Sequence, residues 1–254
     1  MVLIDATAPV ASAAHALGCR VALVQRPGSP VHELAGDETD YYSVDFETRP
    51  SADPAYFTDF VDTVLRPLNP VTVLSLTGAG ALAAATANAL LGTPGTPVDA
   101  VKALAAAGDP EVGDGERVLR AHTFTTDGAH RWVAAVEEGG SPTRPEQVLP
   151  ERALPPEEYG PALAALTGLL DASGLPAGPA LVRLALRDGG VRILTASHGT
   201  GTDDENDLIR RLTGFDLMSS SLRRPLAVPA PPSAAGPPTP AEPCAAGNAG
   251  EAGR

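Results

Sequence analysis

The segment GDPEVGDGER, at residues 108–117, divides this sequence into two parts with different hydrophobic patterns. Glycine, proline and acidic residues dominate the segment, which is typical of a connecting loop. Before it, short apolar runs alternate with helical patterns, whereas paired β-strand patterns prevail after it. We therefore expect an α/β fold built from two units, residues 1–107 and residues 116–224.

The first part begins with a strand, a helix and a second strand. Residues 2–5 and 20–25 are apolar runs, and residues 9–18 between them have helical character that stops at Gly18. This order is the start of a parallel α/β layer. The further expected elements are a helix near 54–66, a strand at 71–76, an alanine-rich helix that follows the turn TGAG (77–80) and ends near Gly92, and a short helix that follows Pro97.

The second part contains two hairpins, each built around a dipeptide that favours a tight β-turn. They cover residues 117–138, with the turn at Asp127-Gly128, and residues 180–197, with the turn at Asp188-Gly189. The other expected elements are a proline-rich loop at 141–156, a helix at 157–172 and a helix at 207–214 capped by Asp203 or Asp204. Residues 225–254 are rich in Pro, Ala and Gly, so we expect a disordered tail there.

The formal net charge of −13 argues against two classes of partner. Proteins that bind nucleic acid or an anionic membrane need a basic face that neutralises phosphate. No apolar run approaches the roughly 20 residues of a membrane span, and the first residues lack the basic region of a secretory signal. Two cysteines, Cys19 and Cys244, make no disulfide framework, so we expect free thiols and a cytoplasmic location.

The order of several stretches matches a known family. Residues 73–104 read VLSLTGAGALAAATANALLGTPGTPVDAVKAL. The later stretches are HTFTTDGAHRWVAAVEE, VLPERALPPEE, LLDASGLPAGPALVRLALRDGGVRILTAS and DLIRRLTGFDLM. In this order they resemble ATP-grasp carboxylate–amine ligases. The resemblance implies a Rossmann-like pre-ATP-grasp subdomain followed by a truncated ATP-grasp α+β lobe.

The chemistry that the resemblance implies is ATP-dependent. ATP phosphorylates a substrate carboxylate, and an amine then displaces the phosphate. Two lysines neutralise the phosphates, a hinge segment holds adenine, and acidic residues with an asparagine hold magnesium. These cations are needed because charge on the transferring phosphoryl group must be neutralised.

The sequence departs from this pattern where the family binds ATP. The Asp-Lys pair of the family falls on Ala106 and Ala107, and residues 108–117 replace the subdomain that carries the hinge and the second lysine. Lys102, the only lysine, lies one turn earlier, where a lone helical lysine is most simply a solvated surface group.

The magnesium positions also differ. The first acidic ligand of the family falls on Arg183, and its Glu-x-Asn strand end falls on Thr195 and Ser197. Magnesium prefers hard, mostly anionic oxygen ligands, and an arginine in their place would repel it. We therefore expect neither ATP nor magnesium as a cofactor.

Other motifs have simpler structural explanations. The TGAG turn is only a fragment of a dinucleotide fingerprint. The acidic run at 203–207 lacks the glycine and distal glutamate of a calcium loop, so a helix cap suffices. Ser197 and His198 are adjacent and have no orienting third group, as a nucleophile and its base would need. The remaining histidines considered lack metal-ligand spacing; they are His15, His122 and His130.

We therefore expect a degenerate ATP-grasp-like protein without ATP-dependent ligase activity, which acts as an accessory or binding protein, with natural-product biosynthesis as one setting. Two alternatives stay open. In the first, the chain is an enzyme that works without ATP in a residual cleft, where a guanidinium holds a carboxylate. That cleft would be lined by Arg183, Thr195, Ser197 and His198. In the second, a partner chain completes an ATP-dependent carboxylate–amine ligase.

The loss of a lobe also predicts a partner. A missing lobe exposes the apolar face that it covered, and large exposed apolar patches are usually occupied. We therefore expect a homodimer or a complex with another protein, such as a full-length ATP-grasp ligase.

Overall fold

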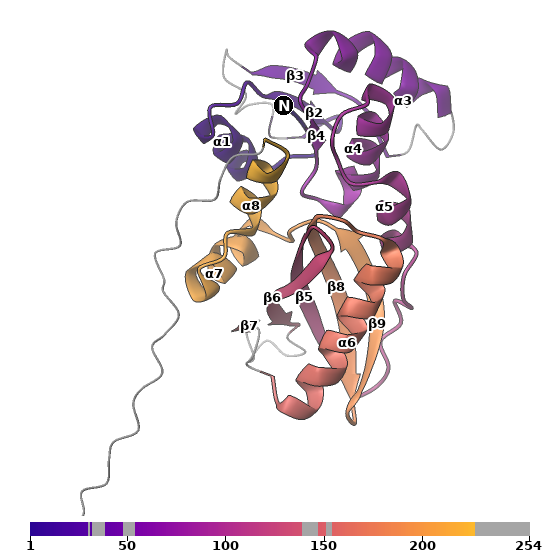
Figure 1. Cartoon of the computed structure of the whole chain (residues 1–254), viewed down its shortest axis with the longest axis vertical. Helices are drawn as coiled ribbons and strands as arrows, with labels where there is room; N and C mark the ends of the chain where they lie inside the picture. The colour runs from indigo at the N-terminus through magenta and orange to yellow at the C-terminus, as the bar shows by residue number, and fades with distance from the viewer. Residues whose placement is uncertain (30, 32–38, 48–53, 139–146, 151–153, 227–254) are drawn as a thin grey trace, which may run out of the picture.

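The computed structural model describes residues 1–29, 31, 39–47, 54–138, 147–150 and 154–226, which form two β-sheets with helices around them (Figure 1). The predicted disordered tail begins at residue 225, but Pro225 and Leu226 belong to a described 3₁₀ turn, Arg224–Leu226. The rest of the tail, with Cys244, lies outside the described residues, so its disorder stays a prediction. Most of the predicted loop at 141–156 lies outside them as well. Within the described residues, every helix falls short of the length and apolarity that a membrane crossing requires.

The first unit contains a four-stranded parallel sheet with the strand order β3-β2-β1-β4. Its strands are β1 (Val2–Ile4), β2 (Ala22–Gln25), β3 (Asp40–Ser43) and β4 (Val73–Leu74). Helix α1 (Ala8–Ala16) connects β1 to β2, which confirms the predicted strand–helix–strand start. Strand β4 is shorter than the predicted strand at 71–76. Strand β3 was not predicted, because its sequence, DYYS, has no apolar run.

The other helices of this unit pack against the parallel sheet. They are α3 (Pro54–Phe60), the π-turn η2 (Val61–Leu65), the 3₁₀ turn η3 (Arg66–Leu68), α4 (Gly78–Leu91) and α5 (Val98–Ala105). Phe57, Val61 and Leu65 are buried against β1 and β4, as the apolar face near 54–66 predicted. Helix α4 ends at Gly92, whose φ of +70° suits a glycine that terminates a helix.

The second unit contains a five-stranded antiparallel sheet with the strand order β7-β6-β5-β8-β9. Its strands are β5 (Arg117–Thr126), β6 (Ala129–Glu137), β7 (Gln147–Pro150), β8 (Gly178–Arg187) and β9 (Gly190–His198). Both predicted hairpins are confirmed, and each turns on an Asp-Gly pair in which both residues have positive φ. Strand β7 corrects the prediction of an unbroken loop at 141–156.

Helices α6 (Pro156–Ser173), α7 (Asp203–Thr213) and α8 (Leu217–Arg223), with the 3₁₀ turn η4 (Arg224–Leu226), complete the second unit. Helix α6 ends at Gly174, as predicted. The N-cap of α7 is Thr202 and not Asp203 or Asp204, because the Thr202 hydroxyl accepts the hydrogen bond from the backbone N–H of Glu205. Helix α8 was not predicted, since its sequence, LMSSSLR, lacks a clear helical pattern of apolar residues.

The antiparallel sheet buries apolar side chains on both faces. One face packs against α5 and α6, in a cluster that includes Leu104, Leu119, Leu166, Leu170 and Leu184. Trp132 belongs to this cluster and stacks on Tyr159, with ring centroids 5.5 Å apart. The other face packs against α7 and α8, through Phe124, Val133, Ile209 and Leu217. Helix α6 lies across the sheet, while α7 and α8 lie between the two units (Figure 1).

Candidate functional site

Strands β5, β8 and β9 bring three of the four predicted cleft residues to one face of the antiparallel sheet. Arg183 is in register with Thr195 on β9 and with Arg120 on β5. Because side chains alternate between the two faces of a strand, Ser197 lies on the same face as Thr195. His198 lies on the opposite face, so the structure does not bring it together with the other three.

His198 is buried at the end of β9, with 8% of its surface exposed. Its Nε2 lies 3.1 Å from the hydroxyl of Thr96, in the loop before α5. Burial lowers the pKa of His198 from 6.5 to about 4, so the ring is neutral at pH 7. Its neighbour Ser197 packs against the first turn of α4. The approach is close, since a Cβ built on Gly78 would lie 3.2 Å from the Ser197 Cβ.

Arg183 belongs to a row of four charged side chains that crosses this face of the sheet. Its Nε and Nη2 donate hydrogen bonds to both carboxylate oxygens of Glu138, at 2.8 and 2.7 Å. Arg120 lies between the two acids, with Nε 3.9 Å from Glu138 Oε1 and Nη2 2.5 Å from Glu205 Oε1. The exposed fractions of these side chains run from 8% to 31%, so water screens the pairs only in part. We call Arg183, Glu138, Arg120 and Glu205 the charged row.

The pair of Arg183 and Glu138 shifts the pKa of both its members. The hydrogen bond from Arg183 holds the pKa of Glu138 below its ordinary value. The same hydrogen bond raises the pKa of Arg183. Both groups are therefore ionised at neutral pH. The carboxylate that the Arg183 guanidinium holds in this structure is that of Glu138.

Glu205 joins the charged row to the start of α7. Its Oε2 accepts a hydrogen bond from the backbone N–H of Thr202 at 3.0 Å, and Thr202 in return caps the helix, which makes a capping box. His122 is buried beside it, with Nε2 4.0 Å from Glu205 Oε2 and Nδ1 3.1 Å from the carbonyl oxygen of Thr200. Burial lowers the pKa of His122 to about 4, so Nδ1 donates from a neutral ring at pH 7.

The loop at 199–202 connects the charged row to the carboxyl end of the parallel sheet. The backbone N–H of Thr200 donates to the carbonyl of Leu76, just beyond β4, at 3.0 Å. The hydroxyl of Thr7, at the start of α1, donates to Asp203 on α7 at 2.9 Å. Ligands of open parallel sheets bind at this carboxyl edge. The charged row therefore lies at the junction of the two units, next to that edge.

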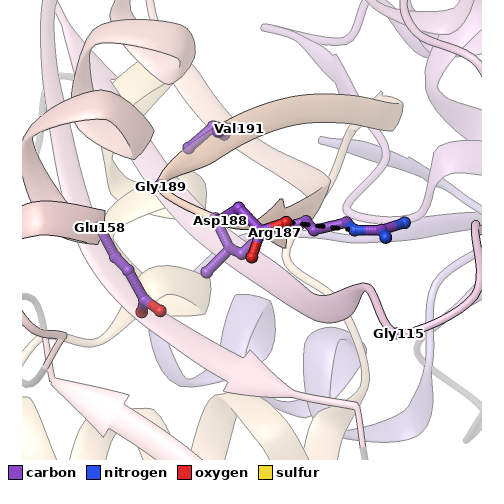
Figure 2. A pocket seen from close by; sticks show the side chains of 8 residues that line it. Gly115, Glu158, Arg187, Asp188, Gly189 and Val191 are labelled. Carbon is purple, nitrogen blue, oxygen red and sulfur yellow. Dashed lines mark ion pairs between the residues drawn. The ribbon is translucent and has the colours of Figure 1, made fainter.

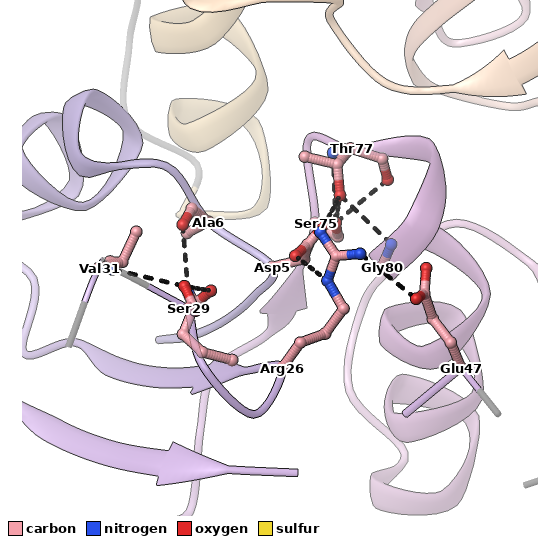
Figure 3. A network of polar contacts seen from close by, with 10 residues as sticks. Asp5, Ala6, Arg26, Ser29, Val31, Glu47, Ser75, Thr77 and Gly80 are labelled. Carbon is pink, nitrogen blue, oxygen red and sulfur yellow. Dashed lines mark hydrogen bonds and ion pairs between the residues drawn. The ribbon is translucent and has the colours of Figure 1, made fainter. Parts of the chain in front are cut away.

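A second polar network lies at the same carboxyl edge (Figure 3). Asp5 follows β1 and accepts hydrogen bonds from the Thr77 hydroxyl at 2.7 Å and from Arg26 Nε at 3.1 Å. Arg26 also reaches Glu47, at 3.4 Å. Thr77 caps α4 through the N–H of Gly80. The network therefore fixes the strand-to-helix turn, and its single guanidinium pairs with two carboxylates.

The glycines of the TGAG turn have a structural role. Residues 78–80 form the first turn of α4, so they do not precede the helix as a separate loop. A Cβ on Gly80 would lie 2.5 Å from the hydroxyl of Ser75 and 3.0 Å from the carbonyl of Ile4. Close packing of α4 on the sheet thus requires glycine at this position.

Two pockets in the described part of the chain lie away from the four predicted cleft residues. One, of about 300 Å³, lies at the tip of the β8–β9 hairpin (Figure 2). It is lined by Gly115, Glu158, Leu186, Arg187, Asp188, Gly189, Gly190 and Val191. The other, of about 440 Å³, lies at the amino end of the parallel sheet beside Cys19 and Arg20. Neither contains a member of the charged row.

The described residues contain no cluster of metal ligands and no buried lysine. Among them, no group of three or more His, Cys, Asp or Glu side chains is arranged to hold a metal ion. Lys102 is exposed on α5. The acidic residues at the start of α7 act there as helix-capping and ion-pairing groups, as the sequence predicted in general terms.

Sequence reasoning missed the charged row itself. The sequence placed Arg120 and Glu138 on the first predicted hairpin and Glu205 in the acidic run. No local sequence pattern indicates that these three side chains meet. Only the strand register places Arg183 of β8 opposite Arg120 of β5, where two like charges require acidic partners nearby. His122 was set aside for lack of ligand spacing, and it contacts Glu205 and Thr200 only through the fold.

Comparison with solved structures finds a fold similar to that of ATP-grasp carboxylate–amine ligases. The L-amino acid ligase from Bacillus licheniformis matches with a TM-score of 0.71 and 15% identity, over 89% of this chain and 73% of that one. Phosphoribosylglycinamide synthetase from Anaerococcus prevotii matches with a TM-score of 0.65 and 11% identity, over 89% and 75%. The biotin carboxylase domain of a single-chain bacterial carboxylase gives 0.62 and 15%, over 93% and 72%.

At these identities the likeness concerns the fold alone. It confirms the predicted likeness to ATP-grasp carboxylate–amine ligases at that level, in a mixed α/β structure with one parallel and one antiparallel sheet. No protein-family profile matches the sequence, and a comparison with curated proteins finds no match.

Proposed function

We propose that this chain is an ATP-grasp-like protein without ATP-dependent ligase activity, which acts as an accessory protein by binding a partner. One observation carries the proposal. The charged row occupies the sheet face on which, by the resemblance, the family places its magnesium ligands. Arg183 stands at the position of an acidic ligand, and its guanidinium is paired with Glu138.

Electrostatics supports this proposal. Two unit charges 4 Å apart repel by about 4 kcal/mol at an effective dielectric constant of about 20, and a dication doubles that figure to about 8 kcal/mol. A magnesium ion that took the Glu138 carboxylate away from Arg183 would meet a repulsion of this order from the released guanidinium. The intact pair is neutral and offers the ion no free carboxylate oxygen. The nearby carboxylates of Glu138 and Glu205 already accept hydrogen bonds or ion pairs at both of their oxygens. The residues present therefore do not fit the metal ion that the fold family implies.

The path of the chain after α5 supports the part of the proposal that concerns ATP, which is that the chain does not bind this nucleotide. The family's Asp-Lys pair falls on Ala106 and Ala107, and residues 106–116 run directly from α5 to β5. Arg192 on β9 donates to the backbone carbonyls of Asp109 and Glu111 in this segment, at 3.2 and 2.7 Å. These hydrogen bonds anchor the short connection to the sheet. In the family that the chain resembles, a whole subdomain that holds adenine would stand at this place.

A titration with Mn²⁺, which prefers the same oxygen ligands as Mg²⁺, tests the proposal without nucleotide. Electron paramagnetic resonance of the full chain should show no loss of the free Mn²⁺ signal. A variant with Arg183→Glu, Thr195→Glu and Ser197→Asn restores the ligand types of the family and serves as the matched comparison. Saturable uptake of one Mn²⁺ by the unchanged chain, abolished by Glu205→Gln, would contradict the proposal.

A further inference from the structure

Helix α7 exposes two leucines on its solvent side. Leu208 is 39% exposed and Leu212 is 51% exposed. Because they lie four residues apart, they form one stripe along the helix. The other strongly exposed large apolar side chains in the described part of the chain lie singly on other segments; they are Val71, Leu82 and Val112. The buried side of α7, with Ile209, faces the antiparallel sheet, so the leucine stripe points away from the core.

Opposite charges lie on the two sides of Leu208 along the helix. Asp204 is exposed in the first turn of α7, and Arg211 is exposed in its last turn, with 69% of its side chain accessible. Asp204, Leu208 and Arg211 are spaced by four and three residues, so they share one face of the helix. This face, which we call the α7 face, is therefore acidic, apolar and basic in order along the helix axis.

We propose that the α7 face binds the α7 face of a second copy of this chain, with the two helices antiparallel about a two-fold axis near Leu208. In this alignment Asp204 of each copy meets Arg211 of the other, and the two Leu208 side chains pack together. A two-fold contact of this kind requires a surface that is complementary to itself. The order of charges along α7 makes the α7 face self-complementary when the two helices are antiparallel. A parallel alignment would place like charges together. The inference goes beyond the proposed function and does not depend on it.

The local charges favour the same arrangement. Arg211 already pairs with Asp207 one turn earlier on its own helix. Its guanidinium remains mostly exposed and carries further donors for a carboxylate of the second copy. Antiparallel helices also place the negative end of each macrodipole beside the positive end of the other. The contact area of one helix face is small, so the dimer should be weak, with a dissociation constant of about micromolar order.

Sedimentation of the full chain at low salt, over about two decades of concentration around the micromolar range, measures this association. We expect a concentration-dependent shift from monomer to dimer that weakens as salt rises. Leu208→Glu should abolish the dimer, whereas Leu82→Glu, on an equally exposed leucine of α4, should leave it unchanged. Asp204→Arg and Arg211→Asp should each weaken it about tenfold, and their combination should restore it. Circular dichroism checks that each variant is folded.

Cross-linking identifies the occupant of the face directly. Leu208→Cys, in a chain that also carries Cys19→Ser and Cys244→Ser, should form a disulfide-linked dimer on oxidation, and Leu82→Cys in the same background should not. Three results would overturn the proposal: a monomer throughout the concentration range, a dimer that survives Leu208→Glu, or a charge exchange that fails to restore association. A Leu208→Cys chain that stays unlinked would indicate that another segment or another protein covers the face.

Discussion

The guanidinium of Arg183 binds both carboxylate oxygens of Glu138, a residue that lies 45 positions away in the sequence, through Nε and Nη2 at 2.8 and 2.7 Å. Such a two-point pair fixes both side chains and satisfies both charges in a partly buried place. It also commits the Nε and one Nη2 donor of Arg183 to Glu138, so the bidentate side of the guanidinium is not available to a substrate carboxylate. The proposed function depends on this pair and on its extension through Arg120 to Glu205.

Loss of Arg183 should destabilise the fold measurably. Arg183→Ala leaves the Glu138 carboxylate, which is 24% exposed, without its two-point partner, so the free energy of unfolding should fall by about 1–3 kcal/mol. Urea denaturation measures it, and a double-mutant cycle with Glu138→Gln isolates the pair. Arg20→Ala is the matched control, because Arg20 is 83% exposed in its pair with Asp40 and should contribute less than about 1 kcal/mol. Equal losses in the two variants would refute this assignment.

Stability should depend on pH through His198. Burial lowers its pKa from 6.5 to about 4, so between these values the unfolded chain binds a proton that the folded chain does not. The free energy of unfolding should therefore fall as the pH drops from 6.5 towards 4, by on the order of 3 kcal/mol for this histidine. His198→Gln should reduce the slope in that window, and the part that remains belongs to the buried His122, whose pKa is also lowered to about 4. A proton NMR titration of the His198 ring with a midpoint near 6.5 would show the assignment to be wrong.

The glycine at 201 should tolerate no side chain. Its φ is +84°, and a Cβ there would lie 2.6 Å from Glu205 Oε2 and 2.7 Å from His122 Cε1. Gly214 has a φ of +71° with no atom within 4 Å of an added Cβ, so Gly214→Ala should cost only the backbone strain, about 1 kcal/mol. Gly201→Ala should lower the melting temperature clearly more than Gly214→Ala does. Similar melting temperatures would mean that the loop at 199–202 can move away from His122.

The elements that the sequence predicted correctly are those with local signals. Asp-Gly dipeptides favour positive φ, so both hairpin turns could be placed, and Gly92, Gly174 and Gly214 mark helix ends because they adopt left-handed conformations. Strand β3 and helix α8 lack such patterns, and only tertiary contacts define them. The N-cap of α7 was placed one or two residues late, because Thr202 and Glu205 form a reciprocal capping box that outcompetes the aspartates.

The charged row could be predicted only in part. The sequence shows that Arg183 stands among strand residues, and alternation places Thr195 and Ser197 on a common face. Which acid Arg183 binds depends on the register of β5 with β6 and β8, including an irregularity in the pairing of β5 with β6. No local pattern encodes that register. His198 was grouped with Ser197 by adjacency, whereas neighbouring residues of a strand point to opposite faces.

The most direct test of the central claim is isothermal titration calorimetry of the full chain with Mg-ATP, with an active ATP-grasp ligase as the positive control. The carboxylates of the charged row are already paired, and by the resemblance Arg183 falls on a ligand position, so we predict no saturable heat of binding. Saturable binding of one Mg-ATP per chain, lost in Glu138→Gln or Glu205→Gln, would contradict the account.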